Sequence, residues 1–216
     1  EQKSEEIRMI IRACNMITDR WPTSDKANDA RMQLGAIYSS ARKPAEAAEW
    51  YGKVPTSDSR YAEAQASAGQ AYMNAYSNAS RLPEGEKPSV EQLNEWLKLA
   101  QQHLRTGITK LTEALPKEGM ASPELCNAKF LLATIIITQG QEAEAIKLLL
   151  DDPHSVIKAV TVADERSRPE RGVTSRKFAS GVYKVLLRAY IGVNNLDKGR
   201  ETMKTLEEIT AGGGAD

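Results

Sequence analysis

Apolar residues recur along most of this chain at the three- and four-residue spacing that predicts amphipathic helices. The first stripe covers residues 5–21 and ends at Pro22. The longest covers residues 90–115 and would extend roughly 39 Å at 1.5 Å per residue. Thr23-Ser24-Asp25 offers N-cap side chains for the helix that follows it, and Ser122-Pro123-Glu124 starts a later one. Further helices are predicted at about 25–41, 44–55, 59–76, 122–137, 141–150, 176–192 and 196–209, with a short helix after residue 156.

Two stretches interrupt this helical pattern. Residues 78–90 contain Pro83, Gly85 and Pro88 among charged residues, which predicts a loop inserted between helices. Residues 151–173 are the least regular part of the chain and include a charged segment, 165–172. Both stretches are therefore read as irregular insertions in an otherwise helical chain.

Small and aromatic residues repeat at a period of 34. Gly69 follows Gly35 and Tyr72 follows Tyr38 at this spacing, which is one of the periods of helical repeat proteins. Each unit would be two helices joined by a short turn, and neither helix could bury its apolar face alone. Stacked units share a continuous core and present a curved surface to a partner.

This pattern resembles the tetratricopeptide repeat, in which a small or aliphatic-Gly-x-x-Tyr stretch precedes Ala-x-x-x-aromatic. The first unit matches fully and the later units match progressively less. The matching residues of the four units, in order, are Leu34, Gly35, Tyr38, Ala47 and Tyr51; Ala68, Gly69 and Tyr72; Leu132, Ala133, Gly140 and Ala145, with Ile136 in place of the aromatic; and Leu186, Tyr190 and Leu206, with Gly199 in place of the small Ala. Arg31, Gln65 and Arg81 depart from the family pattern.

The resemblance implies an all-α fold, a right-handed superhelix of antiparallel helix pairs with about ten helices. It implies a single repeat domain over residues 1–210, followed by a disordered tail at 211–216. The repeat units are expected at about 28–61, 62–116 (with the insertion at 78–90), 122–152 and 178–210. Trp21-Pro22-Thr23-Ser24 is similar to a motif of the envelope-associated branch, which favours a bacterial periplasm or cell envelope over the cytoplasm.

Charge and hydropathy restrict the partners. Lys plus Arg and Asp plus Glu both number 29, so the net charge gives no reason to expect binding to nucleic acid or an anionic membrane. No run approaches the roughly 18 apolar residues of a membrane-spanning helix, and direct membrane insertion is not expected. The chain opens at Glu1 and ends after a Gly-rich run, and we read it as a piece of a longer protein.

Chemistry-bearing clusters are sparse, and we expect no enzyme activity, cofactor or metal. Cys14 and Cys126 lie on apolar faces and are expected to be free buried thiols. Asp151-Asp152-x-His154 resembles a ligand cluster, but a helix end explains it equally well. A basic group could receive phosphate or an acidic peptide, although acidic neighbours favour a solvated loop; it comprises Arg166, Arg168, Arg171, Arg176 and Lys177.

The resemblance also implies where a peptide would bind. In this family the concave groove is lined by first-helix positions, which correspond here to Met32, Ala36 and Ser39; Gln70, Met73 and Asn74; Asn127, Phe130 and Thr134; and Lys184 and Arg188. The family's carboxylate clamp needs Lys, Arg and Asn in successive units, and the first two units lack them. Polar and apolar contacts plus the positive end at Lys184 and Arg188 indicate an acidic or C-terminal peptide.

The leading hypothesis is a non-enzymatic protein-interaction scaffold that binds a peptide segment in this groove. One alternative is a self-associating structural component of the cell envelope, which the apolar residues of the first helix favour. Another is an accessory domain of a larger multidomain protein. The groove could also be filled by the chain's own insertion or by a second copy.

Overall fold

The computed structural model describes residues 2–116, 119–151, 154–162 and 168–211, and side chains from residue 5 onward. Within these ranges there are ten α-helices, one short 3₁₀ helix and no strand, which confirms the all-α prediction. Contacts divide the chain into two compact units, residues 1–110 and 111–216. In a solenoid each repeat contacts only its neighbours, so a single repeat domain could also divide into two such units. The expected single repeat domain therefore stays a prediction.

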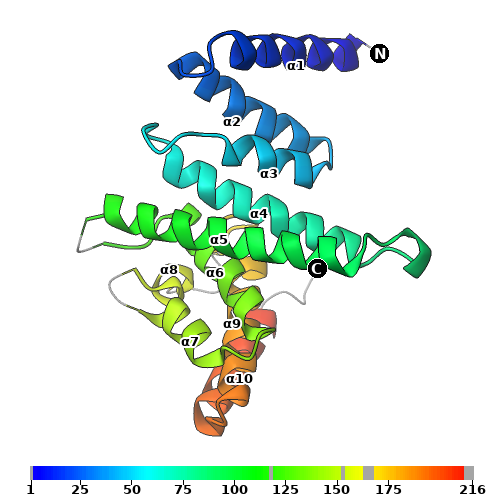
Figure 1. The fold of residues 1–216 in the computed structure, drawn as a ribbon. Coiled ribbons are helices and arrows are strands. Elements are labelled where there is room, and N and C mark those ends of the chain that lie inside the picture. Colours follow the sequence, from blue (N-terminus) through cyan, green and yellow to red (C-terminus); the bar gives the residue numbers. More distant parts are fainter. Residues whose placement is uncertain (1, 117–118, 152–153, 163–167, 212–216) are drawn as a thin grey trace. The chain divides into compact units, whose positions relative to one another are not determined.

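The first unit follows the chain order from helix to helix (Figure 1). Each of the first four helices contacts the next, and a 3₁₀ turn at Glu84–Glu86 lies in the inserted loop. The helices are α1 (Gln2–Arg20), α2 (Asp25–Ser40), α3 (Pro44–Gly52), α4 (Tyr61–Ala79) and α5 (Val90–Ala114), the last of which crosses the boundary between the units.

Two glycines allow α4 and α5 to approach closely. A Cβ on Gly69 would lie 2.6 Å from Leu104 Cγ, and a Cβ on Gly107 would lie 2.7 Å from the Ala66 nitrogen. Both contacts are shorter than real Cβ contacts, so only glycine fits. The prediction that another helix approaches Gly107 is confirmed.

The start of α4 was predicted wrongly. The Ser57-Asp58-Ser59 segment was expected to cap it, but the helix begins at Tyr61 and its N-cap, Arg60, makes no side-chain cap bond. Asp58 instead accepts a hydrogen bond from the Arg60 nitrogen at 2.8 Å and pairs with its guanidinium at 3.0 Å. This pairing lowers the pKa of Asp58, with the Arg60 side-chain hydrogen bond as the main cause.

The second unit contains the last residues of α5 and five further helices. Helix α6 contacts α7, α8 and α9 and is buried on most sides, as its continuous apolar run predicts. The helices are α6 (Pro123–Ile137), α7 (Glu142–Leu150), α8 (Val156–Val160), α9 (Arg176–Gly192) and α10 (Leu196–Ala211). Ala211 therefore belongs to α10, whereas the rest of the expected tail lies outside the described residues.

Three helix pairs turn in the same way. The pairs α2–α3, α6–α7 and α9–α10 each have one residue with positive φ between the helices: Arg42 at 59°, Gly140 at 73° and Asn194 at 57°. This left-handed residue lets the first helix close with a bond from the next N–H to a carbonyl five residues back. Those bonds run from Lys43 to Tyr38 at 2.9 Å, Gln141 to Ile136 at 3.1 Å and Asn195 to Tyr190 at 2.8 Å.

The shared turn gives these three pairs a common register. Tyr38, Ile136 and Tyr190, which the sequence pattern treated as equivalent, all supply the carbonyl that closes the first helix. Four residues after the turn-closing N–H, each second helix buries a small residue: Ala47, Ala145 and Gly199. The alignment of these positions between the hairpins is therefore confirmed, and the assignment to a family stays a prediction.

His103 on α5 is held among α3, α4 and α5. Its Nδ1 lies 2.7 Å from Gln65 Oε1, an acceptor, so Nδ1 carries the proton and donates it. Its ring stacks on Tyr72 at a centroid distance of 5.7 Å. Burial lowers the pKa of His103 from its ordinary value of 6.5 because the charged imidazolium loses solvation.

We expect this histidine to make the first unit less stable in mild acid. Below about pH 6.5 the unfolded chain binds a proton that folded His103 takes up only at lower pH, so stability is lost as the pH falls through the folded pKa. His103→Gln keeps an amide donor for Gln65 without this titration. Thermal unfolding at about pH 7 and about pH 5 should show a larger loss in the wild type than in the variant. Equal losses would contradict the assignment.

Candidate functional site

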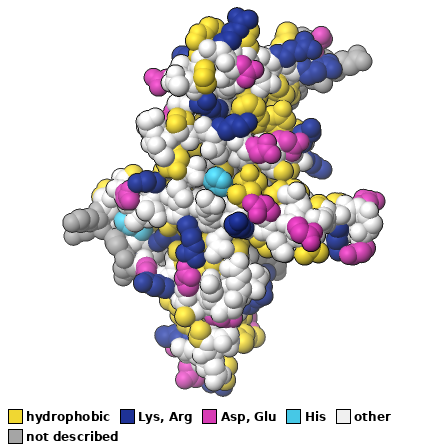
Figure 2. All heavy atoms as spheres, viewed as in Figure 1, with side chains coloured by type: hydrophobic (Ala, Val, Ile, Leu, Met, Phe, Trp, Pro, Cys, Tyr) yellow, Lys and Arg dark blue, Asp and Glu magenta, His cyan; other side chains and the backbone are white. Residues whose placement is uncertain are grey.

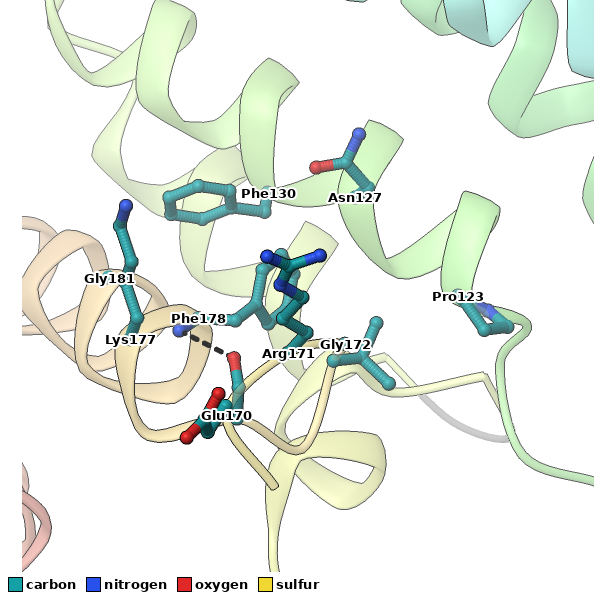
Figure 3. Close-up of a pocket in the computed structure, with 11 residues that line it drawn as sticks. Pro123, Asn127, Phe130, Glu170, Arg171, Gly172, Lys177, Phe178 and Gly181 are labelled. Carbon is teal, nitrogen blue, oxygen red and sulfur yellow. Dashed lines mark hydrogen bonds between the residues drawn. The ribbon is translucent and has the colours of Figure 1, made fainter. Parts of the chain in front are cut away.

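A cavity of about 630 Å³ opens in the second unit between α6 and residues 170–181 (Figure 3). Pro123, Asn127 and Phe130 line one side, and Phe178 and Gly181 of α9 line another. The remaining wall comes from residues 170–173, which belong to the irregular insertion. The lining is mainly apolar, with charged groups at its edge. This pocket combines volume, aromatic surface and a few charges, as binding sites commonly do.

Helix geometry places the α6 residues together. Pro123, Asn127 and Phe130 follow at intervals of four and three residues, so they share one face of the helix. Ser122 fixes the start of α6 by accepting a hydrogen bond from the Leu125 nitrogen at 3.2 Å. Pro123 at the first helical position needs no such bond, since it has no N–H. The local sequence therefore determines where α6 begins and which of its faces lines the pocket.

The start of α9 is fixed in the same way. Ser175 is its N-cap and accepts from the Phe178 nitrogen at 3.3 Å (Figure 3). This cap directs Phe178 toward Phe130, and their ring centroids lie 5.3 Å apart in an edge-to-face arrangement. Both rings are only half-buried and also line the cavity. Two aromatic surfaces are therefore available to an incoming apolar group.

Gly181 leaves the space between these walls open. It lies in the middle of α9 without a positive φ, where glycine costs about 1 kcal/mol relative to alanine. A Cβ there would meet only the Phe130 ring, with Cζ at 3.2 Å. At Gly69 and Gly107 the backbone of a packed helix explains the glycine, but no backbone lies near Gly181. Its absent side chain enlarges the pocket.

The insertion supplies the third wall and is joined to the helices by Arg168. The guanidinium of Arg168 donates to the Val160 carbonyl at 2.8 Å and the Thr174 carbonyl at 3.0 Å. It thereby links the end of α8 to the residue before the α9 cap. Gly172 within the wall has a φ of 92°, which glycine adopts without strain. Arg168 thus has a structural role, while Arg166 of the same predicted cluster lies outside the described residues.

The edge of the pocket carries charges of both signs. Arg171 and Lys177 are exposed there, and so is Glu170. In Figure 3 the Arg171 side chain extends from the insertion toward α6, between Phe178 and Asn127. The chain's own insertion forms one wall of the pocket but leaves it open, so an external ligand would meet this basic and apolar surface.

The structure places the predicted groove residues in two groups. Asn127 and Phe130 line the pocket, and Lys184 and Arg188 are exposed on the face of α9 that also carries Gly181. Met32 lies on α2 and Gln70, Met73 and Asn74 on α4, all in the first unit; both methionines are half-buried and both polar residues exposed.

Sequence reasoning named Arg171 and Lys177 of this pocket as part of a basic cluster that could receive phosphate or an acidic peptide, and it missed Phe178, Gly181 and the rest of the wall at residues 170–173. A signal for Gly181 was present, since Asn194 follows Gly140 by 54 residues and Gly181 follows Asn127 by the same number. Gly181 therefore occupies the α9 position that corresponds to a predicted groove residue. Phe178 and the wall have no such counterpart.

Lys129 and His154, two buried polar residues on or beside α6, have a structural role. Lys129 Nζ donates to the His154 carbonyl at 2.7 Å, and His154 Nε2 lies 3.0 Å from the Pro116 carbonyl. Burial raises the pKa of the neighbouring Cys126 thiol to about 11, so it stays protonated at neutral pH and is a poor nucleophile. Cys14 is also a free buried thiol, as predicted. These contacts hold the segment after α7 and leave no activated nucleophile there.

Other classes of site were searched in the described part of the chain. No group of three His, Cys, Asp or Glu residues there could hold a metal ion, and Asp152 lies outside it. Among the described helices, none is both long enough and apolar enough to span a membrane. Comparison with protein-family models, curated protein sequences and solved structures gave no match.

Proposed function

We propose that this chain is a non-enzymatic protein-interaction module of stacked helix hairpins, and that the pocket between α6 and α9 holds a side chain of a bound peptide. The observation that carries the proposal is Gly181, which costs helix stability, lies directly against the Phe130 ring and lines the pocket. Helix propensity alone would favour a larger residue at this position. The space, the two aromatic rings and the open edge fit an apolar anchor.

A tetratricopeptide-like superhelix is part of the same proposal. Its support is the common turn of the three hairpins and the equivalence of Tyr38, Ile136 and Tyr190. First-helix residues would then form the binding face, and Asn127 and Phe130 belong to both this face and the pocket. The binding free energy would come mainly from a few anchoring contacts, as in other interfaces.

Gly181→Leu tests the pocket. We expect the leucine side chain to occupy the space of the anchor and weaken peptide binding about thirtyfold, which corresponds to about 2 kcal/mol. Higher helix propensity offsets the close contact with Phe130, so the melting temperature should not fall. Peptides selected from a random displayed library against the full chain would be synthesised and titrated by fluorescence anisotropy.

Gly181→Ala is the graded control for this experiment. It adds only the Cβ and should weaken binding much less than leucine. A folded Gly181→Leu variant that binds every selected peptide as tightly as the wild type would place the binding site elsewhere. A library that yields no specific binder would argue against a peptide-binding module altogether.

Self-association is a second candidate function, favoured by apolar side chains at solvent-exposed positions. Met9 and Trp21 on or next to α1 are more than half exposed, and so are Ile191, Leu196 and Met203 of the α9–α10 hairpin. Figure 2 shows a few hydrophobic side chains in yellow among polar ones over that hairpin, at the lower end of the view. Exposed apolar surface of this kind marks interaction sites. Sedimentation equilibrium decides between a monomer and an assembly of copies.

A further inference from the structure

A basic stripe continues from the pocket along α9. Lys177, Gly181, Lys184 and Arg188 are separated by four, three and four residues, which places them on one face of the helix. The three charged members are exposed, and in the described parts of the chain none of them pairs with an acidic side chain. With Arg171, four basic groups lie at the pocket and along the stripe, and the described acidic residues beside them are Glu170 in the pocket lining and Glu142, whose side chain lies against Gly192 at the end of this face of α9.

This excess of positive charge is local. The chain as a whole has 29 basic and 29 acidic residues, so the stripe is not part of a generally basic surface. Some other exposed basic residues of the helices are paired one turn away, such as Lys198 with Glu201 at 2.7 Å and Arg200 with Asp197 at 3.0 Å. Within the described ranges the charged members of the α9 stripe have no such partner, which leaves them available to a ligand.

We propose that the pocket and the α9 stripe together recognise an acidic peptide segment in which a large apolar side chain precedes or follows acidic residues on one side only. This inference rests on the proposed function and adds the chemistry of the partner. The apolar side chain packs on the open surfaces of the Phe130 and Phe178 rings, and the acidic side chains pair with Lys184 and Arg188. At the pocket edge itself Glu170 offsets part of the positive charge of Arg171 and Lys177, so acidic residues are favoured more along the α9 stripe than at this edge.

Helix geometry sets the spacing of the partner's residues. Lys184 and Arg188 lie about 4.5 Å and about 10.5 Å beyond Gly181 along the helix axis, at 1.5 Å per residue. An extended peptide advances about 3.3 Å per residue. Its acidic residues are therefore expected about one to three positions from the anchor. This one-sided pattern distinguishes the site from a surface that attracts any polyanion.

The charge reversal Lys184→Glu with Arg188→Glu tests the stripe. Peptides selected against the wild type from a random displayed library should share one apolar residue with acidic residues on one side. Their affinity should fall about thirtyfold or more in the double variant, since close opposite charges become like charges. Peptides with these acids replaced by lysine should bind the double variant better than the wild type, which a purely structural effect would not produce.

Arg8→Glu with Arg12→Glu is the matched control. These residues are also one turn apart, exposed and on a helix, but they lie on α1. The control should bind the selected peptides within about twofold of the wild type, because neither residue belongs to the pocket lining or to the α9 stripe. Circular dichroism and melting curves of both double variants check that each remains folded.

Each outcome has a distinct meaning. Binding that is lost in Gly181→Leu but unchanged by the α9 reversal overturns the acidic partner and leaves the pocket intact. Binding unchanged by both overturns the pocket as well. A single-stranded DNA homopolymer that binds through Lys184 and Arg188 but is insensitive to Gly181→Leu would assign the stripe to nucleic acid and overturn the proposal.

Discussion

Replacing Gly69 with leucine is expected to lower the melting temperature by roughly 4–8 °C, from a loss of about 2 kcal/mol and 2–4 °C per kcal/mol for a chain of this size. A Cβ at this position would lie 2.6 Å from Leu104 Cγ, 2.9 Å from the Leu104 nitrogen and 3.0 Å from the Ala100 carbonyl. The Leu104 side chain could rotate away, but the contacts with the two backbone atoms can be relieved only if α4 and α5 separate.

The size of this effect follows from two opposing terms. Leucine has a higher helix propensity than glycine by about 0.8 kcal/mol, whereas overpacking costs about 3 kcal/mol. The packing term is larger, so the variant is destabilised. Gly85→Leu is the control, because a Cβ on Gly85 meets nothing within 4 Å. If Gly69→Leu melts like Gly85→Leu and the wild type, α4 and α5 do not meet at this residue.

Ile136→Ala is expected to destabilise the second unit by about 2–5 kcal/mol. Ile136 is fully buried near the end of α6, at the position that Tyr38 and Tyr190 occupy in the other hairpins. Alanine would leave a cavity there, since α7 and α9 pack against α6 and relax only in part. Urea unfolding measures the change as a lower midpoint at an unchanged slope.

Ile191→Ala removes the same atoms from an exposed position and serves as the comparison. Ile191 lies on α9 and is 56% exposed, so its substitution should change stability by less than about 0.5 kcal/mol. Similar losses in the two variants would mean that Ile136 is not part of the core, and the common register of the three hairpins would then be in doubt.

Local signals were sufficient to predict most helices and their turns. The bounds of α9 were predicted correctly because Ser175 caps the helix and Gly192 ends its apolar stripe. Asn194 was expected in the last turn and Gly140 in the earlier one, since both residue types tolerate positive φ. Arg42 also adopts a positive φ, although arginine does not favour this conformation. It can be recognised only from its place in the turn of the α2–α3 hairpin.

Long-range packing accounts for what the sequence did not reveal. The start of α4 depends on the pairing of Asp58 and Arg60, which competes with capping by the neighbouring serines. The boundary between the two units falls within α5, whose apolar stripe continues without interruption. Helical periodicity contains no information on either of these features.

Sequence reasoning named residues of the candidate site in two ways, as groove positions of the repeats and, for Arg171 and Lys177, as members of a basic cluster. Asn127 and Phe130 were identified because they occupy first-helix groove positions. The wall at residues 170–173 has no periodicity and is brought to α6 by the fold of the insertion. Phe178 joins the site because the α9 cap directs it toward Phe130. A pocket built partly from an irregular segment cannot be derived from a repeat pattern.

The two hydrogen bonds of Arg168 hold the insertion whose residues 170–173 form a wall of the pocket. The residues of this wall can therefore change without a change in the stability of the fold. The two bonds connect the Arg168 guanidinium to the Val160 and Thr174 carbonyls, and so fix both ends of the segment through a side chain that does not line the pocket. Substitutions at Glu170, Arg171 or Val173 leave this connection in place. The residues that set the binding preference of the pocket can therefore change during evolution, while the helices that support the pocket keep the same sequence requirements.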